Sequence, residues 1–494
     1  MRKIIYLLII ILIIIESTIN SYAVESRKIL NDKKIIEIGW DTPKADYVEL
    51  NIENMEKNNP FFDGLAIRTN KTTMFDKKLW TDEDLMIDSL KKISFSKYTD
   101  NFLKIEGSSI ANTPDWFDDE LWNNISKNTI KLSKAVKVGH CKGIIFDPEF
   151  YYPGVETTYS PWVFNYKGEN YYKGKSFEEV TKKVYSRGYT FMKALQEENK
   201  SITVFFLAGP SIANDYCQGN IEELKNTPYA LLPAFFDGML EAANSGTKII
   251  DGNEGGSYYI DETRRYALNY NYIKNAIKNI TVKNIKLEKN VEIGYAIYVD
   301  YVSGYLNQDM VNTTNREWEE EYYSMWMKHN IYQALLNTDK YVWVYSEKGS
   351  NENNQKEMDW WSFPSNNLPQ KIKNDIQFAN TRYENGLSLG FDMTKKDCWN
   401  PHEKAIFTEN ENVKITWKSF DEKSLNKVCV MAKVQGIPKK VEFYMDGVLI
   451  AEVKKEPYNI DMYINNKKYQ DIYARVVYDE GKYSSSNIIS LISK

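Results

Sequence analysis

The sequence has little histidine and little cysteine. Its 494 residues include three His and four Cys. Zinc-dependent hydrolase barrels need several His ligands at strand ends, and His140, His329 and His402 do not supply them. The sequence also lacks a visible Ser-His-Asp or Cys-His constellation and a phosphate-cradling glycine loop. These absences make zinc hydrolases, serine or cysteine hydrolases and nucleotide-binding enzymes poor candidates for its function.

An excess of positive charge is also missing. Lys and Arg number 63 and Asp and Glu number 68, which gives a net charge of −5 at pH 7. No basic patch stands out, so we expect no binding to nucleic acid or another polyanion. The chain is instead rich in apolar and aromatic residues, with 36 Tyr, 21 Phe and 12 Trp. That composition argues against wholesale disorder, and the length suits a large barrel plus a small module.

Long hydrophobic runs are absent except at the N-terminus. Residues 4–15 form an apolar run that follows Arg2 and Lys3 and precedes a polar stretch ending in Ser21-Tyr22-Ala23. The run is short for a bilayer span, and this order of features is typical of a signal peptide over residues 1–23. An uncleaved membrane anchor is the alternative. We therefore expect a secreted, periplasmic or cell-surface protein, with no membrane insertion after cleavage.

The four cysteines do not resemble a disulfide framework. They stand at Cys141, Cys217, Cys398 and Cys429. Four cysteines allow three pairings, among which the sequence cannot choose. Isolated buried thiols are the expectation, and a bridge between Cys398 and Cys429 is the alternative.

Short apolar, β-branched runs alternate with helical stretches over most of the chain. The predicted strands are 34–40, 64–69, 102–106, 143–147, 202–208, 248–251, 291–299 and 341–345. The predicted helices are 46–57, 82–93, 117–137, 176–198, 229–244, 261–283, 316–336 and 367–385. Apolar strands that are each followed by a helix indicate a parallel sheet covered on both faces. Eight such units predict an α/β fold of the (β/α)8, or TIM, barrel type, with an open doubly wound sheet as the alternative.

The pattern changes after residue 400 to short strands without helices between them. The predicted strands are 413–420, 427–434, 440–444, 448–453, 458–464, 471–478 and 488–492. Seven strands in about 90 residues indicate a small all-β sandwich. The segment 441–447 and the following Glu456-Pro457-Tyr458 resemble bacterial immunoglobulin-like modules of secreted carbohydrate-active proteins. The expected domains are a signal peptide (1–23), a catalytic barrel (24–402) and an immunoglobulin-like sandwich (403–494) that is dispensable for activity.

Carboxylates follow three of the predicted barrel strands. Asp147 and Glu149 end the fourth strand, Asp251 and Glu254 the sixth, and Glu347 the eighth. The carboxyl ends of the strands form the mouth of a barrel, where active sites lie. Acids gathered there raise one another's pKa, and glycosidic cleavage needs a protonated carboxyl beside an ionised one. The sequence therefore predicts a glycoside hydrolase, although a single such acid is more often a helix cap or a salt-bridge partner.

The roles of these acids follow from their neighbours. Glu149 leads into an aromatic stretch, so we expect it to be the proton donor. Glu254 lies among glycines that leave it open to substrate, so we expect it to be the partner, with Glu347 as the alternative. Asp147 completes the predicted catalytic set.

Aromatic residues concentrate beside these acids. Residues 150–172 include nine aromatic side chains, and a second cluster follows the eighth strand. Aromatic rings pack against the C–H faces of sugars, although a satellite core beneath a long loop has the same composition. The predicted substrate-binding residues are Trp40, Asp41, Arg68, Tyr151, Tyr152, Trp162, Asp251, Asn253, Trp343, Tyr345, Trp360 and Trp361.

The Asp147-x-Glu149 pair resembles the close of the chitinase motif on the fourth barrel strand. The resemblance implies that Glu149 is the general acid and that Asp147 helps the acetamido group of the substrate to act as nucleophile. Lys142 and Ile145 stand where that motif has aspartates, and Pro148 separates the pair. The Asn-Glu pair that stands at the end of the fourth strand in many retaining barrels is also missing. The resemblance therefore leaves the family within the glycoside hydrolases open.

We expect a carbohydrate substrate and no cofactor. A Ca²⁺ or Mg²⁺ site made of Asp147, Glu149, Asp251 and Glu254 is an alternative, because hard cations prefer oxygen ligands. A function from another class is also open: a non-catalytic surface or secreted protein that binds glycans on a hydrolase-like barrel.

Overall fold

The computed structural model describes most of the chain. The described residues are 33–39, 42–107, 114–149, 160–166, 169–260, 262–282, 286–299, 320–346, 370–387, 389–394, 406–409, 413–420, 426–445, 448–464, 470–478 and 483–491. The predicted signal peptide (1–23) lies outside these residues. No helix among them is both long and apolar enough to cross a membrane.

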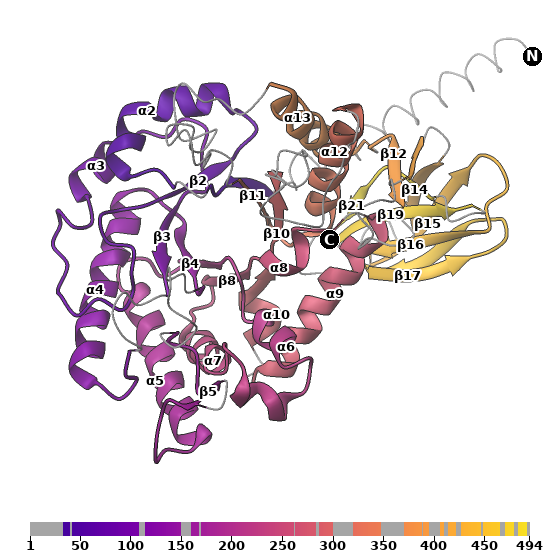
Figure 1. Ribbon diagram of the computed structural model, residues 1–494. Coiled ribbons are helices and arrows are strands. Elements are labelled where there is room, and N and C mark those ends of the chain that lie inside the picture. The colour runs from indigo at the N-terminus through magenta and orange to yellow at the C-terminus, as the bar shows by residue number, and fades with distance from the viewer. Residues whose placement is uncertain are drawn as a thin grey trace, which may run out of the picture.

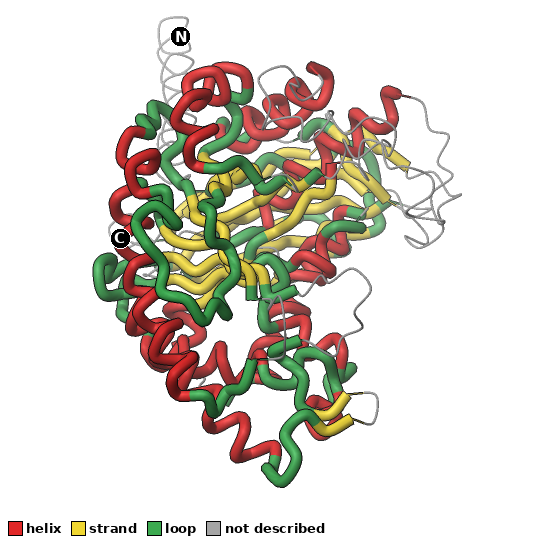
Figure 2. The backbone as a smooth tube through the Cα atoms, turned by 60° about the vertical axis from the view of Figure 1, so that its left-hand side comes forward, coloured by secondary structure: helices red, strands yellow, loops and turns green. Residues whose placement is uncertain are grey.

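A closed ring of eight parallel strands forms the centre of the protein (Figures 1 and 2). The strands are β1 (Lys34–Glu37), β2 (Gly64–Ile67), β3 (Phe102–Glu106), β4 (Gly143–Asp147), β7 (Thr203–Phe206), β8 (Lys248–Asp251), β9 (Val291–Ile293) with β10 (Tyr295–Tyr298), and β11 (Tyr341–Tyr345). Gly294 separates β9 from β10 within one extended segment. Because β9 pairs with β8 and β10 pairs with β11, this segment closes the ring. The predicted (β/α)8 barrel is confirmed.

Helices surround the strands in Figure 2. The eight long or barrel-connecting helices are α2 (Ala45–Asn58), α3 (Ile87–Lys92), α4 (Asp119–Val138), α5 (Phe177–Leu195), α7 (Leu232–Ala242), α9 (Thr263–Ile280), α12 (Glu320–Asn337) and α13 (Gln370–Glu384). Ser176 and Glu179 form a capping box at the start of α5, as its sequence indicates. The helix α3 begins five residues later than expected, because residues 82–86 form turns and Met86 adopts a left-handed conformation.

Shorter elements lie in the connections of the barrel. They are β5 (Asn165–Tyr166), β6 (Glu169–Asn170), α6 (Ser211–Tyr216), η2 (Ile221–Asn226), α8 (Glu254–Ser257) and α10 (Leu287–Asn290). The helix α8 comes directly after β8 and therefore lies at the carboxyl end of the barrel. This is the end at which the candidate acids were expected.

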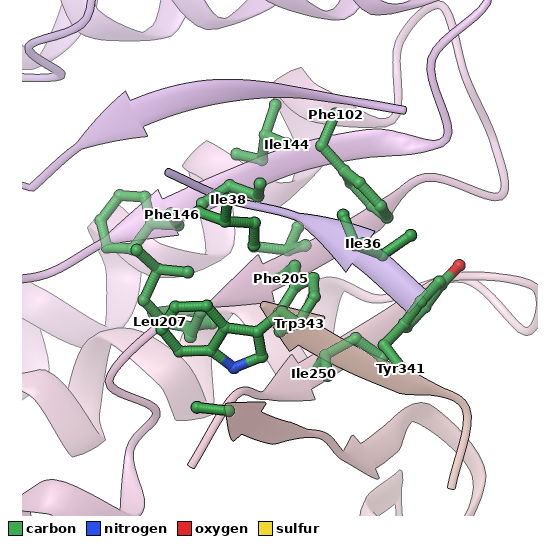
Figure 3. Close-up of a cluster of buried hydrophobic side chains, with 14 of the residues drawn as sticks. Ile36, Ile38, Phe102, Ile144, Phe146, Phe205, Leu207, Ile250, Tyr341 and Trp343 are labelled. Carbon is green, nitrogen blue, oxygen red and sulfur yellow. The ribbon is translucent and has the colours of Figure 1, made fainter. Parts of the chain in front are cut away.

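Alternate residues of each strand face the barrel interior. The rings of Phe102, Phe205 and Tyr341 come from three different strands, yet their centroids are 5.6 to 5.8 Å apart, so these side chains fill the interior (Figure 3). The neighbouring Phe146 and Phe206 face the helices instead, where Phe206 contacts Phe236 of α7. Strand register and the two-residue alternation therefore decide which polar side chains reach the mouth.

The β4 strand approaches β7 too closely for a side chain at its first residue. A Cβ atom on Gly143 would lie 1.7 Å from the carbonyl oxygen of Thr203. We expect Gly143→Ala to lower the free energy of unfolding by at least ~2–3 kcal/mol, because the two strands must separate. Urea unfolding checks this, with Gly255→Ala as the control, since a Cβ at Gly255 meets no atom within 4 Å. Equal effects of both substitutions would contradict the close approach.

The C-terminal part consists of antiparallel sheets. The strands β12 (Phe391–Thr394) and β13 (Ile406–Glu409) pair with each other. A three-stranded sheet contains β14 (Val413–Ser419), β15 (Lys427–Val434) and β18 (Asn459–Tyr463), and a second sheet contains β16 (Lys440–Met445), β17 (Val448–Val453), β19 (Gln470–Val477), β20 (Tyr483–Ser485) and β21 (Ile489–Leu491). Apolar side chains of both sheets share one core. This arrangement is compatible with the expected immunoglobulin-like sandwich, and the proposed boundary at 402/403 stays a prediction.

The C-terminal sheets pack directly against the barrel domain, beside α9 and α12 (Figure 1). Tyr444, Tyr473 and Ile488 belong to the same buried cluster as the barrel core. Asp471 accepts hydrogen bonds from Lys33 at 2.9 Å and from the Tyr383 hydroxyl at 2.8 Å. This contact is that of an integrated domain rather than of a tethered spacer.

A buried polar network also crosses this contact. The Ser485 hydroxyl donates to Asp392 at 2.9 Å, and Thr263 joins Asp392 to the ring of His329. Asp392 and His329 are fully buried, and burial lowers the pKa of His329, which favours its neutral ring. We refer to Asp392, Asp471, Tyr444, Tyr473 and Ile488 as the joint.

Three of the four cysteines are described. Cys141, Cys217 and Cys429 are buried free thiols, and Cys398 lies outside the described residues. The expectation of isolated buried thiols is confirmed for these three.

Candidate active site

The Asp147-x-Glu149 pair lies at the mouth of the barrel. Asp147 pairs across the sheet with Glu106, in the same alternation as Phe102, so its carboxyl faces the interior. It accepts a hydrogen bond from the backbone N–H of Glu149 at 3.1 Å. The Trp162 indole donates to the carbonyl of Pro148 at 2.8 Å and so holds the turn between the two acids. The position of Asp147 agrees with the expectation that strand β4 presents this pair at the mouth.

The neighbouring strand β3 adds a cation and an acid that the sequence analysis missed. Lys104 Nζ lies 3.8 Å from Asp147 and 3.9 Å from Glu106. Burial raises the pKa of Asp147 and of Glu106, and the charge of Lys104 opposes this rise in both. The charge of Arg68, which directly follows β2, also opposes the rise in the pKa of Glu106. A signal was present in the sequence: Lys104 and Glu106 alternate with apolar residues in a strand.

Glu254 is the fourth acid of the mouth. It begins α8, directly after Asn253, which adopts a left-handed conformation with φ of 56°. Tyr258 donates a hydrogen bond to Glu254 Oε1 at 2.9 Å. The other oxygen, Oε2, is buried and has no hydrogen-bond partner among the described residues. Burial raises the pKa of Glu254 well above its usual range, and the negative charges of Glu149 and then of Asp147 raise it further.

An aromatic wall stands beside Glu254. The Tyr258 ring lies 5.5 Å from Trp343, 5.8 Å from Tyr345 in a stacked arrangement, and 5.0 Å from Tyr298, all between ring centroids. Trp343 and Tyr345, both predicted from the end of the eighth strand, therefore lie close to the acid. Trp343 itself is fully buried and donates to the carbonyl of Gly252, so it supports the wall from within.

Sequence reasoning missed the tyrosines of this region. Tyr258 and Tyr298 stand in the wall, and burial raises the pKa of Tyr229, as do the charges of Glu149, Asp147 and Glu254. Tyr229 therefore lies within the field of all three acids. Tyr298 could have been found as the last residue of a barrel strand, but Tyr229 and Tyr258 come from connections that carry no such signal.

Asp251 and Asn253 are not open to substrate as expected. Asp251 pairs with Phe206, which faces the helices, and its carboxyl accepts backbone hydrogen bonds from Ser211 at 3.1 Å and from Asn253 at 3.0 Å. A Cβ on Gly209 would lie 2.0 Å from this carboxyl. Burial raises the pKa of Asp251 to about 6. Both residues are buried, so they hold the turn that presents Glu254 rather than line the mouth.

Trp162 is likewise a core residue. It is fully buried, and its ring lies among those of Trp116, Phe75 and Phe235. This environment is the satellite core that the aromatic stretch also allowed. Its hydrogen bond to Pro148 makes it a support for the two acids of β4.

Several predicted site residues lie outside the described residues. They are Trp40, Asp41, Tyr151, Tyr152, Glu347, Trp360 and Trp361. Their assignment to catalysis or substrate binding stays a prediction.

Within the described parts of the chain, no three His, Cys, Asp or Glu side chains gather in a way that could hold a metal ion. Asp251, one of the four oxygen ligands considered for Ca²⁺ or Mg²⁺, points away from Asp147 and towards the helices. The four acids therefore do not fit one ion. The expectation that no cofactor is needed stays untested.

Comparison with known proteins gives structural similarity only. No model of a protein family matches the sequence, and no curated protein matches it. An alpha-amylase of Anoxybacillus is 9% identical with a TM-score of 0.37, over 91% of this chain and 99% of that one. The alpha-amylase of Geobacillus thermoleovorans is 9% identical (TM-score 0.39; 94% and 99%), and a broad-specificity endoglucanase from Clostridium longisporum is 11% identical (0.42; 73% and 98%). Similarity this low assigns no activity.

Proposed function

We propose that the protein is an exported glycoside hydrolase that cleaves a poly- or oligosaccharide with the acids of the barrel mouth. The observation that carries the proposal is the placement of the Glu254 carboxyl, whose Oε1 accepts a hydrogen bond from Tyr258 and whose Oε2 is buried. Burial there raises the pKa of Glu254 well above its usual range, and the charges of Glu149 and Asp147 add to the rise. A carboxyl that stays protonated beside ionised carboxyls is what glycosidic cleavage requires. In the aromatic wall beside Glu254, Tyr345 is half-buried and offers a ring on which a sugar can pack.

In this proposal Glu149 and Glu254 exchange the roles that the sequence predicted for them. Glu254 is the proton donor, because it holds its proton at a pH where an ordinary carboxyl has lost it. Glu149 takes the role that the sequence predicted for Glu254: it attacks the sugar or activates water. Asp147 lies 3.8 Å from Lys104, whose charge favours the carboxylate against the effect of burial, and in that form Asp147 stabilises positive charge that develops on the sugar ring.

The pH dependence of the reaction tests this division of roles. Glu254 donates only while protonated, so kcat/KM is lost as the pH rises through its raised pKa. Glu149 acts only while ionised, so activity is also lost at low pH, when it takes up a proton. We expect a bell-shaped profile of kcat/KM, measured by the release of reducing ends from a panel of soluble polysaccharides.

The same panel separates the two classes of function. Release of reducing ends from any glycan supports the hydrolase. Binding of a glycan that is never cleaved, at any pH between 4 and 9 or after long incubation, would contradict it and support the non-catalytic glycan-binding alternative.

A further inference from the structure

Glu254 and Tyr258 are coupled within a single helical turn. The two residues lie four positions apart in and after α8, which places their side chains on one face. The backbone N–H of Tyr258 donates to the carbonyl of Glu254 at 3.3 Å, and the Tyr258 hydroxyl donates to Glu254 Oε1 at 2.9 Å. The carboxyl is therefore tied to its own helix through the phenol.

The phenol is itself fixed in place. Its ring stacks on Tyr345 with an angle of 16° between the planes and also contacts Tyr298 and Trp343, and only 8% of the residue is exposed. Burial raises the pKa of Tyr258 well above its usual value, and the nearby charge of Glu254 adds to this. The hydroxyl therefore keeps its proton and remains a donor near neutral pH.

The two oxygens of Glu254 are consequently unequal. Oε1 accepts the hydrogen bond of Tyr258, whereas Oε2 is buried without a hydrogen-bond partner among the described residues. When the carboxyl is protonated, its hydrogen atom is best placed on Oε2, because a proton on Oε1 would compete with the phenol.

We propose that Tyr258 is a positioning residue that holds the Glu254 carboxyl and stabilises its charged form through the hydrogen bond to Oε1. This inference rests on the proposed function and assigns a role that the catalytic pair alone does not supply. In the step, the glycosidic C–O bond breaks and its electron pair stays on the leaving oxygen. That oxygen takes the proton of the Glu254 carboxyl and departs as an alcohol. The negative charge left on Glu254 is then stabilised by the hydrogen bond from Tyr258 to Oε1.

The substitution Tyr258→Phe tests the role, because it removes the hydroxyl and keeps the ring in the stack. The lost hydrogen bond favours the charged carboxylate, so its removal raises the pKa of Glu254 further. We expect the alkaline limb of the pH profile to move up by about one to two pH units. We expect kcat to fall about ten-fold, a fraction of the 10²–10⁴ that a general acid supplies, with little change in KM.

Tyr345→Phe is the matched control, since it removes a hydroxyl from the same stack but leaves the bond to Glu254 intact. Its alkaline limb should stay in place, whatever happens to its KM. A purely structural role of Tyr258 would lower activity without moving the limb, and that result would overturn the inference.

A titration without substrate keeps this inference separate from the proposed function. The carboxyl ¹³C signal of Glu254, assigned by its loss in Glu254→Gln, can be followed against pH in protein labelled at glutamate. A higher midpoint in Tyr258→Phe than in the unsubstituted protein supports the coupling even if no glycan is cleaved. An equal or lower midpoint in a folded variant would overturn it even if the protein is a hydrolase.

Discussion

Replacement of Glu254 by Gln is expected to lower kcat on a natural glycan by about 10²–10⁴-fold, because the amide has no proton to give to the leaving oxygen. The loss should depend on the leaving group. An aryl glycoside with an acidic phenol leaves without protonation, so Glu254→Gln should keep most of the activity on it. Initial rates on the two substrate types, measured side by side, check this expectation.

Replacement of Glu149 by Gln should differ in one respect. The activity of Glu149→Gln should fall by as much on the aryl glycoside as on the glycan, because the attack on the sugar fails in both cases. Added azide, a small anionic nucleophile, should restore part of the activity of Glu149→Ala, which leaves room for the anion, and none of that of Glu254→Gln on the glycan. The surface substitution Glu198→Gln, which affects only an exposed ion pair with Lys137, serves as the control.

The opposite pattern would also be informative. If Glu149→Gln kept its activity on the aryl glycoside and Glu254→Gln did not, then Glu149 would be the donor. Glu149 and Glu254 would remain the proposed catalytic pair, but the roles assigned to them from burial and charge would be wrong.

Removal of residues 403–494 is expected to prevent stable folding of the barrel. The cut takes Tyr444, Tyr473 and Ile488 out of a core that they share with the barrel. At about 1.5–3 kcal/mol for each fully buried large apolar side chain, this loss is comparable with the whole stability of a typical domain. It also removes Ser485, which donates a hydrogen bond to Asp392, and Asp471, which accepts one from Tyr383. We expect an aggregated product or a strongly lowered Tm, measured by circular dichroism.

A point substitution tests the same contact without a cut. Tyr473 is almost completely buried at the joint, so Tyr473→Ala should cost about 3–5 kcal/mol. Tyr463 lies in the same C-terminal domain but is 74% exposed, so Tyr463→Ala should cost little. A truncated chain ending near His402 that folds with an unchanged Tm would instead support the expectation of a dispensable module.

Local sequence patterns predicted the strands and long helices of the barrel well. Runs such as Gly143–Asp147 are apolar on both faces because a barrel strand is covered by the interior on one side and by helices on the other. The eight strands and eight helices of the barrel were therefore readable from hydrophobic periods. The start of α3 was not, because the turn at Met86 depends on a backbone conformation that the apolar pattern does not encode.

The joint could not be predicted from local patterns. Tyr444 and Tyr473 have the apolar alternation of any sandwich strand, and nothing in that alternation says which outer face meets another domain. Their ring stack contributes to the barrel core only because the two domains are in contact.

The sequence by itself determined that acids stand at the ends of the fourth and sixth strands, because a strand end is visible as the end of an apolar run. Only the tertiary structure decided which of these acids face the mouth. Asp147 pairs with Glu106 on the interior side, whereas Asp251 pairs with Phe206 on the helix side. In a strand buried on both faces the hydrophobic pattern does not distinguish the two sides. The side that a residue faces depends on register with neighbouring strands, and register is a property of the closed barrel rather than of any one segment.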